Sequence, residues 1–470
     1  MNIYYLERIE QTAVQKGLST QSIWCKLWND IMKSKPSRFG TVTCWRKKFL
    51  ESFFHNVLRG ILDVSSDHRL IDHRFSPLMH SSRHVSELTI CNKQQGVTEL
   101  PQAVVECLTQ SVETLKFLHL RSSDPARRSP CACSCTISST TGGRGEGSTP
   151  ETTPKEEKAG VGASPLLGVI HYRSVRALNL HNVPLTLSSC RSLCHLLCSW
   201  TALERLTMAY NDLGANIQLV LESLSALSRA PSCCLRVFSL SDFTTFVPML
   251  ELAHAVLRIF PQLQLLSLSY DLESPSEWVR AAEVTVPCAG VTSSAGVGEA
   301  AILSPHSCLL TVSAENRLQT LELRFPQDPV QVERLVSVLT ASRSLLELSL
   351  DNATFPGQDD LRRVLRVIAD GNTSLRRLSF HDMKMSDAHC EILHLLNHSR
   401  LEEMKFSFCR LFEEGSGDFL MDFVAAIKRN PNVRILKLSG NRLGNEGLCV
   451  LADLFSSSDA VCGIHYLDVR

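Results

Sequence analysis

Three cysteines at alternate positions form the pattern in this sequence that is most suggestive of metal binding. Cys131, Cys133 and Cys135 carry thiols, which as thiolates bind soft metal ions such as zinc. Zinc hairpins use the spacing C-x-x-C, however, and no fourth ligand lies near this C-x-C-x-C run. We therefore predict that these cysteines hold no metal ion.

A second candidate metal cluster consists of four histidines that lie close together in the sequence, His381, His389, His394 and His398. We expect His381 on a strand and the other three on the following helix and its end. His394 and His398 are four residues apart but lack the glutamate of the H-E-x-x-H motif. We interpret all four as surface histidines or as histidines whose hydrogen bonds are already satisfied.

Phosphate binding and nucleophilic catalysis also lack the residues that they require. The glycine-rich run 142–147 neither follows a predicted strand nor ends in the G-K-[ST] of a phosphate-binding loop. Cys25 and Cys44 would need a positioned histidine to act as nucleophiles, and their tryptophan-rich helical surroundings favour packing. No G-x-S-x-G motif occurs. We predict a protein that is not an enzyme and uses no cofactor.

The elements that carry these side chains follow a repeated pattern, which is clearest between Leu436 and Phe455. There an L-x-L-x-x-N-x-L segment precedes an amphipathic helix, as in one leucine-rich repeat. Ten segments match the frame L-x-x-L-x-L, and their starts are 26 to 32 residues apart with one interval of 55. They begin at Val175, Leu203, Leu235, Leu263, Leu318, Leu345, Leu375, Leu401, Val433 and Ile464. The pattern predicts an α/β leucine-rich-repeat solenoid, a ribonuclease-inhibitor-like horseshoe with a parallel sheet inside and helices outside.

The first residues differ from the repeats and predict a small all-helical module over 1–62. Three helices are expected at 3–16, 19–33 and 41–60, the second capped by Ser19 or Thr20. These helices carry the aromatic residues Trp24, Trp28 and Trp45. Two interpretations remain open for the module: a cap that seals the end of the sheet, or a docking module for another subunit.

The remaining boundaries follow from shifts in composition. Degenerate leading repeats are expected at 63–121, and a stretch rich in Ser, Thr, Gly and Pro predicts a disordered linker at 122–165. The repeat array then covers 166–470. The interval of 55 residues predicts an irregular insertion at 271–316, long enough for one further degenerate repeat.

Charge and hydropathy exclude several classes of function. The 48 basic and 48 acidic residues balance, which argues against nucleic acid as a partner. No apolar run is long enough to span a membrane, and charges stand within the first ten residues, where a signal peptide would be apolar. We expect no membrane association, a cytoplasmic or nuclear location, and reduced cysteines that serve as small core residues, such as Cys190, Cys194, Cys198, Cys390, Cys409 and Cys449.

What remains for function is a surface. Within each strand of the frame, the residues beside the inward leucines should face the concave side of the sheet. The residues that face the concave side are small and polar in the early repeats and charged in the repeats of the C-terminal half. The candidate partner-binding residues there are Arg377, Ser379, His381, Glu403, Lys405 and Lys437. The alternative is an ordinary solvated sheet face.

Several segments outside and inside the repeats carry a family resemblance. They include NIYYLERIE, GLSTQSIWCKLWNDIMK, VTCWRKKFLESFFHNVLRG, FSFCRLFE and GNRLGNEGL. In these segments the chain resembles Elongin BC-binding leucine-rich-repeat proteins. The resemblance implies a substrate-recognition adaptor of a cullin-RING E3 ubiquitin ligase of the cullin-5 type. Its partners would be Elongin B, Elongin C, the cullin-RING module and an unknown substrate protein.

The chain departs from that family in one respect. The family's BC-box, which binds Elongin C, and its cullin-selecting L-P-x-P element lie upstream of NIYYLERIE, where this chain starts. Neither Ser192-Leu193 with Cys198 nor Leu88 with Cys91 has the spacing of a substitute. Because the chain also ends on a repeat strand, we expect it to be truncated at both ends.

Two other functions remain open. The first is a non-catalytic scaffold or inhibitor that binds a partner protein through the repeats without leading to its ubiquitination. The second is an F-box-like receptor, because Trp24-x-x-x-Trp28 faintly resembles that box.

Overall fold

The computed structural model describes most of the chain and divides it into two compact units. Unit 1 comprises residues 1–204 with 232–234, and unit 2 comprises 205–231 with 235–470. The described residues are 3–32, 44–59, 77–91, 102–119, 166, 169–172, 174–243, 247–271, 316–326, 329–412, 417–456 and 463–470. The predicted disordered linker at 122–165 lies outside them, as does nearly all of the insertion predicted at 271–316.

Unit 1 begins with helices that pack around aromatic side chains. They are α1 (Ile3–Gln15), α2 (Gln21–Leu27), the π-helix η1 (Trp28–Met32), α3 (Trp45–Leu58) and α4 (Pro77–Ser82). Trp24, Phe49 and Leu50 are buried at the centre, with Trp45 and Phe53 packed against them. The indole of Trp24 and the ring of Phe49 have centroids 5.5 Å apart. Burial of such large rings is the main stabilising contribution available to so small a helical group.

The start of α2 differs from the prediction in its capping. Thr20 precedes the helix, but its side chain makes no capping hydrogen bond to the backbone. The Thr20 hydroxyl instead donates to the carboxylate of Glu10, which also accepts a hydrogen bond from Nε1 of Trp24 at 2.9 Å. Both of these groups are buried, so the bonds offset the desolvation of polar atoms inside the module.

Unit 1 continues with three parallel strands and two helices. These are β1 (Glu87–Cys91), α5 (Gln102–Ser111), β2 (Thr114–Leu118), β3 (Ala177–His181) and α6 (Leu187–Ser199). Leu88, Leu115 and Leu178 occupy equivalent positions in the register of the three strands, and all three are buried. Because β2 pairs directly with β3, the chain between them adds no strand at this point of the sheet.

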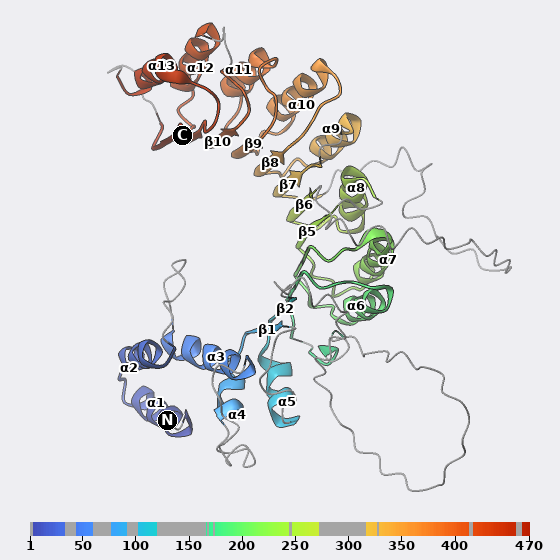
Figure 1. Cartoon of the computed structure of the whole chain (residues 1–470), viewed down its shortest axis with the longest axis vertical. Helices are drawn as coiled ribbons and strands as arrows, with labels where there is room; N and C mark the ends of the chain where they lie inside the picture. Colours follow the sequence, from blue (N-terminus) through green and yellow to red (C-terminus); the bar gives the residue numbers. More distant parts are fainter. Residues whose placement is uncertain are drawn as a thin grey trace, which may run out of the picture. The chain divides into compact units, whose positions relative to one another are not determined.

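Unit 2 is a regular alternation of strands and helices (Figure 1). Its elements are β4 (Arg205–Ala209), η5 (Gly214–Asn216), α7 (Ile217–Ser228), β5 (Val237–Phe243), α8 (Met249–Ile259), β6 (Leu265–Asp271), β7 (Thr320–Arg324), α9 (Val332–Ala341), β8 (Glu347–Asp351), α10 (Gln358–Gly371), β9 (Arg377–His381), α11 (His389–His398), β10 (Glu403–Ser407), α12 (Gly417–Arg429), β11 (Ile435–Lys437), α13 (Gly444–Ser456) and β12 (Tyr466–Asp468). Each strand pairs in parallel with the next strand in the sequence.

The repeat leucines explain this arrangement. Leu348, Leu378 and Met404 lie side by side in adjacent strands, and each is at most 1 % exposed. These three side chains are on the buried side of the strands. The helices lie on one side of the strands of this unit (Figure 1). Alternate residues of each strand point the other way, as the period of two requires. The predicted α/β leucine-rich-repeat solenoid is therefore confirmed.

Strand β6 pairs directly with β7, with Leu266 beside Leu321. The residues predicted as an irregular insertion separate these strands in the sequence but add no strand between them. A further degenerate repeat inside the sheet at this place, which the length of the interval allowed, is therefore excluded.

The turns that follow β4, β8, β9, β10 and β11 share a left-handed backbone at one equivalent position. Tyr210, Asn352, Asp382 and Phe408 have φ angles of 49° to 56°, and Gly440 has a φ of 71°. Asparagine, aspartate and glycine tolerate this conformation better than other residues do. Three of these five positions thus carry suitable residues, whereas tyrosine and phenylalanine at the other two are unusual.

Asn441 fixes the turn between β11 and α13. Its Oδ1 accepts hydrogen bonds from the backbone N–H groups of Cys409 at 3.0 Å and Leu411 at 3.3 Å. Its Nδ2 donates to the carbonyl groups of Leu438, at 2.8 Å, and Phe406. The buried amide therefore joins two consecutive repeats, which explains the asparagine of the repeat motif.

The cysteines are less uniformly buried than predicted. Among the described residues Cys190 and Cys409 are buried, and Cys194 is partly buried. Cys198, Cys390 and Cys449 are exposed, so the prediction of small core residues was wrong for these three. They lie on helices α6, α11 and α13, on positions that turn away from the sheet.

Candidate partner-binding face

All six residues predicted for partner binding lie on one side of three adjacent strands. We call the side of strands β7–β11 that points away from the buried leucines the strand face. On β9 the buried residues Leu378 and Phe380 alternate with the exposed or half-buried residues Arg377, Ser379 and His381. The register places Ser379, Lys405 and Lys437 side by side across β9, β10 and β11. The structure thus brings the predicted residues together, while their role in binding stays a prediction.

The first charged contact of the strand face joins β8 to β9. The guanidinium of Arg377 lies 2.8 Å from Oε2 of Glu347, and its Nε donates to the same oxygen at 3.0 Å. The Arg377 side chain is 53 % exposed, so the pair is solvated and contributes little to folding. Its effect is to hold the guanidinium in a defined position above the sheet.

A chain of polar contacts runs along the ends of the strands. The hydroxyl of Tyr210 donates to Asp271 at 2.8 Å, and Nε of Arg324 lies 3.8 Å from Asp271 and 3.5 Å from Asp351. Asp351 in turn lies 2.8 Å from Nδ1 of His381. Side chains from β6 to β9 and from the turn after β4 are thereby linked into one network.

Glu403 lies between two lysines at the other end of the strand face. Its Oε1 is 3.1 Å from Nζ of Lys405 and 3.5 Å from Nζ of Lys437. Burial works to raise the pKa of the Glu403 carboxyl, but the hydrogen bonds and charges of the two lysines outweigh it and lower the pKa. The Lys437 ammonium also lies 5.6 Å from the ring centroid of Tyr466, a cation–π contact.

Sequence reasoning missed the partners of these residues, namely Tyr210, Asp271, Arg324, Glu347, Asp351 and Tyr466. Most lie in the first and last outward positions of the strands, whereas the prediction considered mainly the middle position. Aligning the repeats on their buried leucines would have paired Glu347 with Arg377 and Asp351 with His381, as the register does.

The tryptophans predicted for the docking module lie largely inside it. Trp24 is 2 % and Trp28 4 % exposed, and Trp45 is partly buried against the same cluster. The rings of Trp28 and Trp45 have centroids 6.1 Å apart. In the described residues these side chains therefore pack the module, and a docking role for it would fall to its exposed surface.

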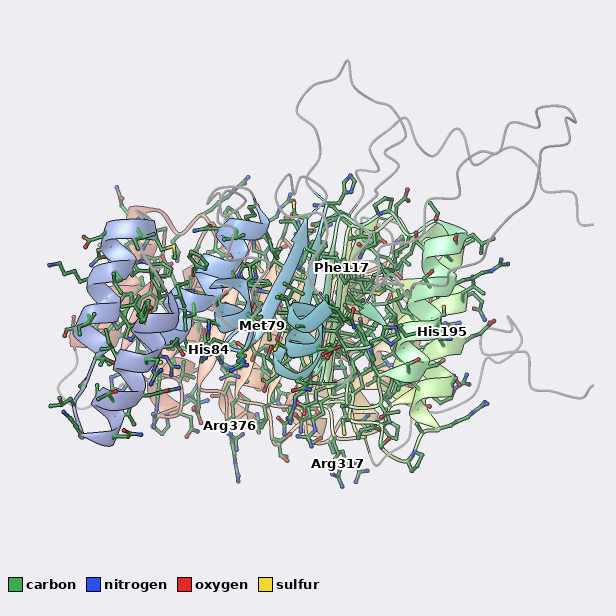
Figure 2. All side chains as sticks on the ribbon, turned by 90° about the horizontal axis from the view of Figure 1, so that it is seen from below. Met79, His84, Phe117, His195, Arg317 and Arg376 are labelled. Carbon is green, nitrogen blue, oxygen red and sulfur yellow. The ribbon has the colours of Figure 1, made fainter. Side chains whose placement is uncertain are left out.

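A second feature of the module is an ion pair that joins α1 to α3 and to the turn after α4. Nε of Arg46 donates to Glu7 at 2.8 Å, and Nε2 of His84 lies 3.4 Å from the same carboxylate. Figure 2 labels His84 beside the N-terminal helices. Burial works to raise the pKa of Glu7, but the hydrogen bonds and charges of Arg46 and His84 lower it from 4.5 to about 2.

The histidines considered as metal ligands make hydrogen bonds and ring contacts within the fold. Nε2 of His394 lies 2.8 Å from Asp370, and Nδ1 of His398 lies 2.9 Å from the carbonyl of His394. The ring of His389 stacks on Phe419 with centroids 3.7 Å apart. Within the described ranges, no three His, Cys, Asp or Glu side chains are grouped as a metal site would require. The cysteines at 131, 133 and 135 and the glycines at 142–147 lie outside those ranges.

The helices of the described parts were also compared with the length and hydropathy that a membrane span requires. None of them meets both criteria.

The parallel strands, the buried leucines and the shared asparagine define a leucine-rich-repeat protein whose repeats form a protein-binding scaffold. The chain is 34 % identical to leucine-rich repeat-containing protein 41 of Rattus norvegicus, with 98 % of this chain and 81 % of that protein covered. The proteins of the same name from Mus musculus and Homo sapiens are 33 % identical over the same shares. The chain therefore belongs to the leucine-rich repeat-containing protein 41 family.

Other comparisons add less. No protein-family model matches the chain. A solved Bacteroides fragilis protein superposes with a TM-score of 0.34 and 16 % identity, over 63 % of this chain and 66 % of that one. The TLR13–ssRNA13 complex superposes with a TM-score of 0.35 and 12 % identity, over 82 % of this chain and 36 % of that one. At these TM-scores the fold rests on the repeat geometry described above.

Proposed function

We propose that this protein is the substrate-recognition adaptor of an Elongin BC/cullin-RING ubiquitin ligase of the cullin-5 type, acting in the cytoplasm or nucleus. It supplies no catalytic group. The helical module docks to Elongin and the cullin module, while the strand face holds a substrate protein near the recruited ubiquitin-conjugating enzyme. The adaptor accelerates ubiquitin transfer by proximity.

The observation that carries the proposal is the charged strand face on a family-specific repeat array. Its ion pairs, such as Arg377 with Glu347, are solvated and preoriented, as is usual where a protein partner is recognised by complementary charge. Membership of the family and the resemblance in both the helical module and the repeats favour an adaptor over an unrelated repeat scaffold.

The module offers an exposed apolar surface that suits docking. Tyr5 and Ile9 are one helical turn apart on α1 and are 60 % and 56 % exposed, and Ile23 on α2 is 49 % exposed. Ile3, Glu7 and Glu10 occupy the opposite, buried side of α1. Large apolar side chains exposed on a helix are a common feature of helix-mediated subunit contacts.

Co-expression of the whole chain with Elongin B and Elongin C tests the docking half of the proposal. We expect a complex that survives gel filtration. Ile9→Asp places a charge on the exposed side of α1 and should abolish the complex, whereas Met421→Asp, at a position 55 % exposed on α12, should leave it intact. Absence of any complex, under conditions in which a protein with a BC-box binds, would reject docking through the helical module. The adaptor function would be rejected if a longer chain that also carries the family's upstream BC-box failed as well.

A reconstituted ubiquitination assay with a partner protein captured through the strand face separates the adaptor from the scaffold or inhibitor. An adaptor transfers ubiquitin to the captured partner, and both capture and transfer fall in the charge-reversed variant Lys405→Glu. A scaffold captures the partner equally well, but ubiquitination does not depend on this chain. Binding to the Skp subunit in place of Elongin would instead support the F-box-like alternative.

A further inference from the structure

An aromatic side chain occupies a backbone position of unit 2 that disfavours it. Phe408 follows β10 and has a φ of 56°, while the equivalent turn positions after β8, β9 and β11 carry Asn352, Asp382 and Gly440. These three residue types accept the left-handed conformation readily, whereas a bulky residue there is strained. Tyr210, Arg410 and Arg442 have the same left-handed backbone. Strain that is kept at exposed residues of a turn indicates that their side chains serve a purpose other than folding.

The Phe408 ring is held firmly although it is exposed. The side chain is 55 % exposed, yet its backbone N–H donates to the carbonyl of Ser439 at 2.8 Å. The ring of His381 approaches it edge-on with centroids 5.5 Å apart. Gly440 lies against its other side, where an added Cβ would come within 2.5 Å of the Phe408 ring. An apolar group that is both exposed and immobilised loses little conformational entropy when a partner covers it.

The charges around Phe408 favour one sign of partner. On β9–β11 the outward residues include the bases Arg377, Lys405 and Lys437 but only one acid, Glu403. On β7 and β8 the balance is reversed, with Glu322, Glu347 and Asp351 against Arg324. The strand face is therefore basic on the side where Phe408 lies.

Two arginines of the adjoining turns extend this basic area. Arg410 and Arg442 are exposed, and neither has an ion-pair partner among the described residues. Asn441 places them close together, because its Oδ1 binds the N–H groups on both sides of Arg410 and Arg442 follows it directly. One exposed acid, Asp382, lies in the neighbouring turn after β9, and its backbone N–H donates to the carbonyl of Ser407.

We propose that Phe408 is the apolar anchor of the partner-binding face, and that it receives an acidic segment of a partner protein with a hydrophobic side chain beside its carboxylates. The hydrophobic side chain packs on the Phe408 ring, and the carboxylates pair with Arg410, Arg442 and Lys437. This assignment rests on the proposed function in so far as the segment belongs to the substrate protein. Aromatic and arginine residues together are the commonest sources of binding energy at such interfaces.

Panning a library of short random peptides on the whole purified chain tests this directly, with Elongin absent. We expect enriched peptides to contain an aromatic or aliphatic residue next to Asp or Glu. Phe408→Asn should weaken their binding at least about tenfold while the unfolding midpoint stays equal to or above that of the original chain, because asparagine accepts the left-handed backbone. This combination separates loss of an anchor from loss of folding.

A second variant and a control complete the test. Arg442→Gln, a change of an exposed side chain, should weaken peptide binding about threefold or more, and the loss should shrink at high salt. Met421→Ala, on the helix side of unit 2, should change nothing.

Three results would overturn the assignment: no enriched peptide, enriched peptides without acidic residues, or equal binding by Phe408→Asn. Binding of a single-stranded RNA probe that depends on Phe408 would also overturn it, in favour of nucleic acid. Because Elongin is absent, failure here leaves the docking experiment unaffected, and failure of Elongin capture leaves the peptide result standing.

Discussion

Arg377 and Glu347 form a two-point contact across β9 and β8, in which one carboxylate oxygen of Glu347 accepts from both Nε and the terminal guanidinium nitrogen. Their strands are adjacent and in register, so the two residues occupy equivalent positions of consecutive repeats. Such a contact recurs across this face with different residues, as in His381 with Asp351. The repeat geometry itself therefore generates lateral charge pairs wherever opposite charges occupy the same outward position.

Removal of this pair should affect binding more than folding. In Arg377→Ala the free energy of unfolding should fall by about 0.5 kcal/mol, because an exposed ion pair is worth little. A double-mutant cycle with Glu347→Gln, followed by urea denaturation, measures the coupling. Capture of a partner by the strand face should fall in Arg377→Ala. A coupling well above about 1 kcal/mol would show that the pair is structural.

Asn441 should be among the most sensitive positions of the array. Asn441→Ala removes the acceptor for two buried backbone N–H groups and should lower the free energy of unfolding by about 2–4 kcal/mol. Urea denaturation measures this. Asn445→Ala, an exposed asparagine of α13, serves as the control and should change stability by no more than about 0.5 kcal/mol. Equal effects of the two changes would contradict the role assigned to Asn441.

The Glu7–Arg46 contact should make the stability of the helical module depend on pH. The folded-state pKa of Glu7 is lowered from 4.5 to about 2, so protonation favours unfolding. The stabilisation is complete above about pH 5 and is lost as the pH falls from 4.5 towards 2. It amounts to about 1–2 kcal/mol once solvent screening of the partly exposed partners is allowed for.

Denaturation of the original chain and of Glu7→Gln at pH 7 and pH 3 measures this contribution. The difference between the two proteins should be largest at pH 7 and should fall to less than half of that value at pH 3. Glu106→Gln, at an exposed glutamate of α5, should show no such pH dependence. A difference that grows on acidification would contradict the sign worked out from the pKa of Glu7.

Glu403 should lower the affinity of the strand face for acidic partners. It lies within 3.5 Å of both Lys405 and Lys437, so Glu403→Gln leaves two lysines without their shared acid. Binding of the enriched acidic peptides should strengthen about threefold at low salt, and the gain should shrink at high salt. Fluorescence polarisation measures both, with Glu446→Gln on α13 as the matched control. Weaker binding by Glu403→Gln would place the peptide elsewhere.

Thiol reactivity should separate the buried cysteines from the exposed ones. Burial raises the pKa of Cys409 to about 12, whereas Cys390 and Cys449 are exposed. Iodoacetamide at pH 8, followed by peptide mass spectrometry, should modify the exposed pair in minutes and Cys409 only as fast as the protein unfolds. Rapid modification of Cys409 in the folded chain would show that this repeat opens locally.

The fold was predictable because a few apolar positions determine it. Leucines at a fixed spacing, such as Leu345, Leu348 and Leu350, must be buried together, and only stacked repeats bury them. The direction of the outward residues then follows from the period of two. The six predicted strand-face residues accordingly lie where the sequence placed them.

The rest depended on information that no local pattern contains. Trp24 was equally compatible with a core position and with an interface position, because an indole is apolar with one polar atom. The buried hydrogen bond of 2.9 Å from its Nε1 to the carboxylate of Glu10 shows that it lies in the core. The left-handed backbone of Phe408 is set by the turn that follows β10, and the residue type alone does not indicate it. The sequence also did not show that Cys390 and Cys449 lie on the exposed sides of their helices, because this depends on how each helix is oriented against the sheet.

The direct pairing of β6 with β7 bears on how such arrays change in evolution. The two strands lie in register although their sequences are separated by residues 272–319, so the sheet itself places few demands on the length of that connection. Doubling a flexible connection costs only about 0.6 kcal/mol in loop-closure entropy. The alignments with relatives span more positions than this chain has residues, which shows that the family tolerates insertions. A whole foreign domain could be grafted at this junction while the repeats on either side keep their stacking.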